Sequence, residues 1–74
     1  MIDIKDVTMN DIGRWVRFTY QHGETQDGRL KQFNRKYLFI VFKCDGKWSE
    51  YRDYTSESCE PESCEFISHQ QASF

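Results

Sequence analysis

The chain has 74 residues, including six Phe, four Tyr and two Trp, and a formal net charge of −2 at pH 7. This length fits one small domain that buries only about 60% of its unfolded surface, so a buried polar active site would cost stability that is scarce. A sequence pI of about 5.6 argues against a dedicated nucleic-acid binder, which is usually clearly basic. We find no signal peptide and no apolar run near the roughly 20 residues that cross a membrane, and therefore expect a cytoplasmic protein without a membrane partner.

Charge is unevenly distributed along the chain. Residues 1–47 carry nine Lys or Arg and six Asp or Glu, whereas residues 48–74 carry one Arg and six Asp or Glu. A folded domain with this sequence can present a basic face and an acidic face. The three cysteines are an odd number, which does not suit a disulfide framework, so we expect reduced thiols.

The first third of the chain predicts two short elements and one full strand. Residues 1–4 alternate and suit a short edge strand. Residues 6–13 suit one helical turn, which Asn10 can cap and Gly13 can close with a positive φ. Residues 14–20 then alternate between large apolar and polar side chains, which predicts a strand.

The middle of the chain predicts two further strands around a tight connection. Residues 21–28 contain two glycines and predict a loop, and residues 29–33 predict a strand. Asn34, the residue most tolerant of left-handed geometry, suits the connection that follows. Residues 37–42 are apolar on both faces and predict a central strand that is covered on both sides. Asp45-Gly46 is a strong signal for a two-residue hairpin turn.

The last third alternates again and then becomes polar. Residues 47–54 predict the second strand of the Asp45-Gly46 hairpin, because large rings alternate there with charged side chains. Residues 55–63 predict an acidic loop that ends in a helical turn, and residues 64–67 predict a last short strand. We therefore expect a small closed β-barrel, whose closure removes exposed strand edges, over residues 1–67, and a flexible tail over residues 68–74.

Several segments together form a recognisable order: Asp11-Ile12-Gly13-Arg14-Trp15-Val16, Gly28-Arg29-Leu30, Asn34, the strand 37–42, Tyr54-Thr55 and Pro61-Glu62-Ser63-Cys64-Glu65-Phe66. Over residues 8–67 this order resembles a group of short proteins encoded by tailed bacteriophages and prophages, with departures at Gln32-Phe33 and Ser63-Cys64. The group is similar in pattern to Src-homology-3-like, KOW and Tudor barrels. The resemblance implies a mainly β, five- to six-stranded SH3-like barrel with one short helical turn, and a phage origin. It implies no activity, because fold does not fix function.

Basic side chains interleaved with an aromatic ring form the first candidate surface: Arg29, Lys31, Phe33, Arg35 and Lys36. Such groups can hold a phosphate backbone and stack a base, which indicates a nucleic-acid or nucleotide partner. Strand alternation places Arg29, Lys31 and Phe33 on one face. The alternative is an ordinary solvated hairpin in which Phe33 packs on its neighbours.

Aromatic rings form the second candidate surface, namely Trp15, Trp48, Tyr51 and Tyr54. Trp15 and Arg17 lie opposite the expected core face of their strand, and we expect Trp15 and Tyr51 to be exposed. In Tudor-like barrels an aromatic cage binds cationic side chains. The alternative is that a very small barrel needs these rings to fill its core.

The third candidate surface is the acidic stretch of Glu57, Glu60, Glu62 and Glu65, with Glu50 and Asp53 before it. It can imitate nucleic-acid phosphates or engage a basic host protein, or it can simply keep the protein in solution. Cys59, Cys64 and His69 are spaced five and five, without the paired C-x2-C spacing of zinc sites, so we expect no metal and no other cofactor.

No sequence motif for catalysis is present, neither a glycine-rich phosphate loop nor a zinc-protease or nucleophile-elbow motif, so we expect no enzyme. The resemblance implies a phage-type accessory protein that binds a host protein, as an inhibitor of host machinery or of anti-phage defence. The alternative is a nucleic-acid or nucleotide-binding barrel that uses the hairpin at residues 29–36. A virion or assembly component is a third interpretation, and the sequence leaves self-association open.

Overall fold

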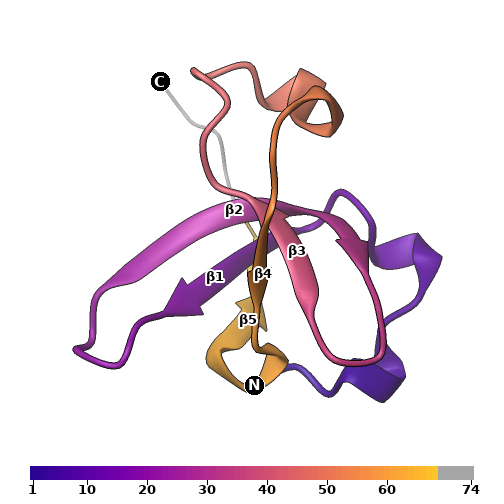
Figure 1. The fold of residues 1–74 in the computed structure, drawn as a ribbon, viewed down its shortest axis with the longest axis vertical. Coiled ribbons are helices and arrows are strands. Elements are labelled where there is room, and N and C mark those ends of the chain that lie inside the picture. The colour runs from indigo at the N-terminus through magenta and orange to yellow at the C-terminus, as the bar shows by residue number, and fades with distance from the viewer. Residues whose placement is uncertain (69–74) are drawn as a thin grey trace.

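The computed structural model describes residues 1–68 and shows a mainly β protein with five antiparallel strands in one open sheet over that part of the chain (Figure 1). The elements are, in chain order, η1 (Ile4–Asp6), η2 (Met9–Asp11), β1 (Trp15–Thr19), β2 (Thr25–Phe33), β3 (Leu38–Val41), η3 (Trp48–Asp53), β4 (Glu57–Cys59), η4 (Pro61–Ser63) and β5 (Cys64–Phe66). The strands lie in the order β4-β3-β2-β1-β5. The predicted tail lies almost wholly outside the described residues, as does His69.

The strands expected at residues 14–20, 37–42 and 64–67 are confirmed as β1, β3 and β5, each with slightly narrower bounds. β2 begins at Thr25, so the second half of the expected loop 21–28 is strand. The expected strand at residues 47–54 is wrong: this segment forms the 3-10 turns of η3. Within the described residues, the chain contains four 3-10 elements; two of them, η2 and η4, lie where the sequence predicted helical turns, within residues 6–13 and at the end of residues 55–63.

The two ends of the sheet also differ from expectation. Residues 1–4 form no edge strand, and part of this segment instead begins the 3-10 turn η1. β4 lies at residues 57–59, inside the segment that was expected to be a loop. The Asp45-Gly46 turn is present, with positive φ at both residues (54° and 78°), but it leads into η3 rather than into a second strand.

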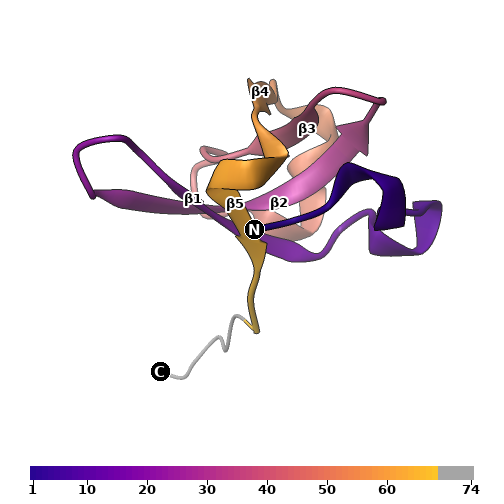
Figure 2. The same ribbon diagram turned by 90° about the horizontal axis from the view of Figure 1, so that it is seen from below.

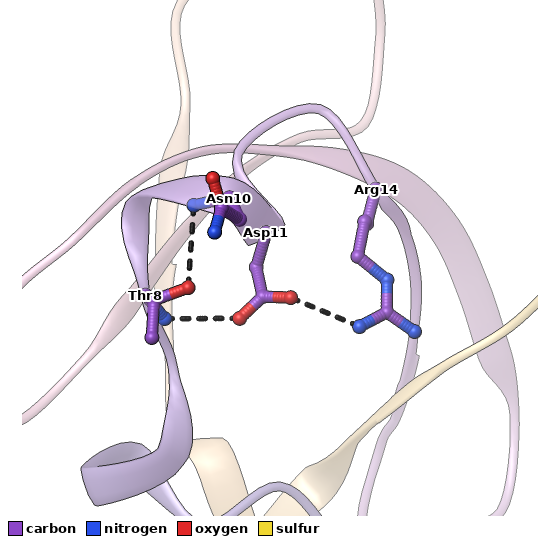
Figure 3. A network of polar contacts seen from close by, with 4 residues as sticks. All are labelled: Thr8, Asn10, Asp11 and Arg14. Carbon is purple, nitrogen blue, oxygen red and sulfur yellow. Dashed lines mark hydrogen bonds and ion pairs between the residues drawn. The ribbon is translucent and has the colours of Figure 1, made fainter.

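A capping box, rather than the expected cap by Asn10, fixes the turn before β1 (Figure 3). The Thr8 hydroxyl accepts from the Asn10 backbone N–H at 3.2 Å, and the Asp11 carboxylate accepts from the Thr8 backbone N–H at 2.9 Å. Asp11 also pairs with Arg14 at 3.0 Å. These bonds hold the pKa of Asp11 below its ordinary value, the Thr8 backbone contributing most and Arg14 next. Gly13 closes the turn with the positive φ that was expected, 95°.

In Figure 1, β1 and β2 run across the view while β3, β4 and β5 run steeply through it, which shows that the sheet is strongly twisted. β1 and β2 pair from Trp15↔Arg29 to Thr19↔Thr25 and form a hairpin that projects from the rest of the molecule (Figures 1 and 2). The register between β2 and β3 shifts between Leu30 and Gln32, which places a β-bulge at Lys31.

Apolar side chains gather on both faces of the sheet. The larger cluster contains Val16, Leu30, Leu38 and Ile40, all with no exposed surface. A smaller cluster on the other face joins Val41 to three groups of the following segment, namely Cys44, Tyr51 and the partly buried ring of Trp48. The expectation that residues 37–42 are covered on both sides is confirmed for Leu38 and residues 40–42, whereas Phe39 is half-buried and Tyr37 is exposed. β3 is flanked by β2 and β4, and β2 is the middle strand of the sheet.

Gly28 lies against β3 with no room for a side chain. A Cβ added at Gly28 would lie 2.4 Å from the carbonyl oxygen of Val41 and 2.7 Å from Cγ2 of Ile40. No side chain fits at that distance, so the close packing of these two strands requires glycine at this position.

Candidate functional site

Arg29 connects the sheet to the segment that covers its second face. Its Nε donates to the carbonyl oxygen of Gly13 at 2.8 Å, and its Nη1 donates to the carbonyl oxygen of Trp48 at 2.9 Å. The guanidinium also lies over the ring of Tyr51, 4.5 Å from its centroid. The predicted aromatic cage would bind a cation of a partner protein. In this structure a cation of the same chain, the Arg29 guanidinium, already lies over the Tyr51 ring.

Lys31 has a similar role at the other end of η3. Its Nζ donates to the carbonyl oxygen of Tyr54 at 2.8 Å, in a partly buried position. Two of the four cations of the predicted basic surface are thus bound to backbone carbonyls of the same domain. The remaining two, Arg35 and Lys36, are exposed at the β2–β3 turn next to the exposed ring of Tyr37.

The prediction that Arg29, Lys31 and Phe33 share one face is wrong. Phe33 packs against the larger core cluster with Leu30, while Arg29 and Lys31 reach the opposite face. The physical reason is the β-bulge at Lys31: the extra residue breaks the alternation of side chains between the two faces. Phe33 also lines a shallow hollow with Met9 and Ile12.

The predicted aromatic surface is largely internal. Tyr51 is only 5% exposed, which corrects the expectation that it faces solvent. Trp15 is half-buried and packs against the half-buried Trp48 with ring centroids 4.7 Å apart. Arg17 is exposed but forms a two-point pair with Asp27, at 2.8 and 3.1 Å. That pair raises the pKa of Arg17 above its ordinary value, chiefly through the hydrogen bond. A small second core needs these rings, as the alternative interpretation held.

The acidic stretch, by contrast, faces solvent. We call Glu57, Glu60, Glu62 and Glu65 the acidic edge, because they lie on β4, η4 and β5 and on the short link between them. All four side chains are exposed. Glu65 pairs with the N-terminal ammonium at 3.6 Å, while the other three make no ion pair with the described residues. No Lys or Arg follows Arg52 in the sequence, so no cation of this stretch offsets their charge.

A hollow of about 480 Å³ lies beside the acidic edge, between the N-terminal segment and β5. Three carboxylates border it, those of Asp3, Asp6 and Glu65, and its apolar lining comes from Met1, Ile2, Val7 and Phe66. Sequence reasoning missed the hollow and the two aspartates. The available signal was the mixture of apolar residues with Asp3 and Asp6 at the start of the chain, which gave no reason to place that segment beside β5.

The three cysteines are buried and reduced. Cys59 on β4 and Cys64 on β5 pack in the same core cluster, and their thiols interact with each other. The Cys59 thiol donates to the carbonyl oxygen of Glu57 at 3.7 Å, and the Cys64 thiol donates to that of Glu60 at 3.4 Å. The interaction between the two thiols lowers the pKa of Cys59, while the same interaction, together with burial, raises the pKa of Cys64. In residues 1–68, no three His, Cys, Asp or Glu side chains are grouped so as to hold a metal ion.

Comparison of the chain with protein-family models, with curated proteins and with solved structures finds no significant match. Among the described residues, no helix is long and apolar enough to cross a membrane. The structural features that bear on function are an exposed acidic edge, a hollow beside it, and a basic segment whose first two cations, Arg29 and Lys31, bind carbonyl groups of the same domain.

Proposed function

We propose that the chain is a non-enzymatic binding module that docks on a basic surface of a partner protein through its acidic edge. One observation supports this proposal most directly: Glu57, Glu60 and Glu62 follow one another closely in sequence, all three are exposed, and none forms an ion pair with the described residues. Clustered charge of one sign destabilises a compact state through self-repulsion, and it accelerates encounter with a surface of the opposite sign.

The use of Arg29 and Lys31 within the domain strengthens the same proposal. Both side chains donate to backbone carbonyls, so their charges are partly shielded from an external partner. The acidic edge has no such internal use, apart from the pair between Glu65 and the N-terminal ammonium. A partner protein that approaches the domain therefore meets fewer accessible positive charges than a count of the basic segment suggests, while the acidic edge remains accessible.

We further propose that the fold is a small SH3-like barrel and that the protein is of the phage accessory type, acting on a host protein in the cytoplasm as an inhibitor of host machinery or defence. The barrel proposal is supported by the chain path, a β1-β2-β3-β4 meander followed by a 3-10 turn and a last strand that returns to β1. The phage proposal rests on the resemblance described above.

The test is affinity capture from a bacterial lysate, followed by measurement of direct binding to each purified candidate. The wild-type chain is compared with a variant that carries Glu57→Lys, Glu60→Lys and Glu62→Lys, and with a matched variant that carries Arg35→Glu and Lys36→Glu. We expect the acidic-edge variant to lose a basic partner and the turn variant to retain it. Equal binding by both variants would contradict the proposal.

The second candidate function is nucleic-acid or nucleotide binding, which the exposed cluster of Arg35, Lys36 and Tyr37 favours. Two cations and a ring can hold a phosphate and stack a base. In that case the turn variant, rather than the acidic-edge variant, loses binding to a labelled oligonucleotide, and the affinity falls steeply with salt. The absence of a gel shift at low salt would eliminate this candidate.

A further inference from the structure

β5 is the last strand of the sheet and pairs with β1 on one side. The Ile67 N–H donates to the carbonyl oxygen of Trp15 at 3.0 Å, so these two residues form a hydrogen-bonded pair of the antiparallel ladder. Such pairs alternate with non-bonded pairs, which makes Arg17 and Glu65 the next bonded pair. The backbone N–H and C=O of Phe66 therefore point away from β1, toward the side of β5 on which no strand of residues 1–68 pairs.

The hollow beside the acidic edge lies against the same strand. Phe66 and Glu65 form one wall, and Ile2, Asp3 and Val7 from the N-terminal segment belong to the other. Both ribbon views place the N-terminus beside β5 (Figures 1 and 2). A free strand edge, apolar lining and a carboxylate rim thus occur together in a space of about 480 Å³.

We propose that this edge binds an extended, lysine- or arginine-containing segment of a partner protein by strand addition to β5. The backbone of the segment pairs with Phe66, an apolar side chain enters the hollow, and basic side chains face Asp3, Asp6 and Glu65. This inference rests on the proposed function, because it takes from it that the partner is basic. It adds where on the domain the partner binds and how.

Charge selects this occupant over two others. A second copy of the chain, paired β5 to β5, would place the acidic edges of two molecules against each other, and like charges across an interface are unfavourable. A nucleic-acid strand would bring phosphates to the carboxylates of Asp3, Asp6 and Glu65. A cation is already accommodated at this rim, because the N-terminal ammonium lies 3.6 Å from Glu65.

The experiment is an NMR titration of the full ¹⁵N-labelled chain with three blocked synthetic hexapeptides. The first alternates lysine and valine, the second has the same sequence with every backbone nitrogen methylated, and the third alternates glutamate and valine. We expect the first to bind and to shift the amide signals of Phe66 and of residues 1–7. The methylated peptide keeps its lysine charges but loses its backbone N–H donors, so we expect it to bind at least about tenfold more weakly than the first peptide. We expect no binding of the glutamate peptide.

A pair of charge-reversal variants locates the site. Asp6 borders the hollow, whereas Asp53 lies at the end of η3; both are exposed. We expect Asp6→Lys to weaken binding of the lysine peptide several-fold and Asp53→Lys to leave it unchanged, with the ¹⁵N spectra confirming that both variants fold.

The outcomes separate the two proposals. Equal affinity for the methylated and unmethylated lysine peptides would overturn strand addition at β5, as would amide shifts confined to Glu57–Cys59. Either result would leave the proposal of a basic partner intact. Failure of every lysine peptide to bind at low salt would overturn both proposals.

Discussion

Replacing Arg29 with methionine tests whether this cation serves the fold or recognition. Methionine keeps an unbranched, largely apolar stem and removes the guanidinium with its donors and charge. Two hydrogen bonds are lost, to the carbonyl oxygens of Gly13 and Trp48, together with the stacking on Tyr51. A hydrogen bond from a charged group contributes about 1.5–3 kcal/mol, and a cation–π contact about 0.5–1 kcal/mol at an exposed site.

Arg29 is half-buried, so water can replace part of what is lost, and we expect a net destabilisation of about 2–4 kcal/mol. A domain of this size has only about 4–11 kcal/mol in total, so the effect is large. Urea unfolding followed by tryptophan fluorescence is the assay, since Trp15 and Trp48 both lie next to the guanidinium. The matched control is Lys36→Met, at an exposed turn, for which we expect less than about 0.5 kcal/mol.

A second variant refines the interpretation. Arg29→Lys keeps the charge but cannot reach both carbonyls with one planar fork, so we expect an intermediate loss of stability. If Arg29→Met changes the free energy of unfolding by less than about 1 kcal/mol while it abolishes binding to a partner, our assignment of Arg29 to the fold is refuted.

Three further predictions concern stability. Gly28→Ala places a Cβ against the carbonyl oxygen of Val41 and should destabilise by about 3 kcal/mol or more, measured by thermal unfolding; a loss under 1 kcal/mol would contradict the close strand approach. Ile40→Ala removes a fully buried side chain and should cost about 2–5 kcal/mol in urea unfolding, so a near-neutral result would mean that the core is misplaced. Asp11→Asn keeps one oxygen that can accept from the Thr8 N–H but removes the charge that strengthens this bond and pairs with Arg14, and it should cost about 1 kcal/mol at pH 7. The pKa of Asp11 is lowered in the folded protein, so its contribution is complete above the ordinary value of 3.8 and disappears as the pH falls through the lower folded value; an unchanged difference at pH 2 would refute this origin.

The sequence predicted the strands whose apolar pattern is strong and missed those whose pattern is short or polar. Residues 37–42 are unmistakable because their side chains are apolar on both faces. β4, Glu57–Cys59, has three residues and no large side chain, so nothing in its composition distinguishes it from a loop. Large rings and charged side chains are interspersed over residues 47–54, but Trp48, Tyr51 and Tyr54 lie three apart, which suits a 3-10 turn rather than the two-residue period of a strand.

The candidate surfaces were harder to predict because they depend on pairing. Strand periodicity cannot reveal the bulge at Lys31, which separates Arg29 from Phe33. Nor can a list of cations show which of them find carbonyl acceptors inside the fold, as Arg29 and Lys31 do. The exposure of Glu57, Glu60 and Glu62 was predictable, because carboxylates are rarely buried without a partner.

The pairing of β1 with β5 has a consequence for biosynthesis. Val16 lies opposite Phe66, near the other end of the chain, whereas β1, β2 and β3 are joined by local hairpins. Long-range pairing of this kind forms late, so the β1–β2–β3 meander exists first with one edge of β1 unpaired. Until β5 leaves the ribosome, Val16 and Phe18 have an incomplete cover, and the nascent chain is then most sensitive to proteases and to association with other chains.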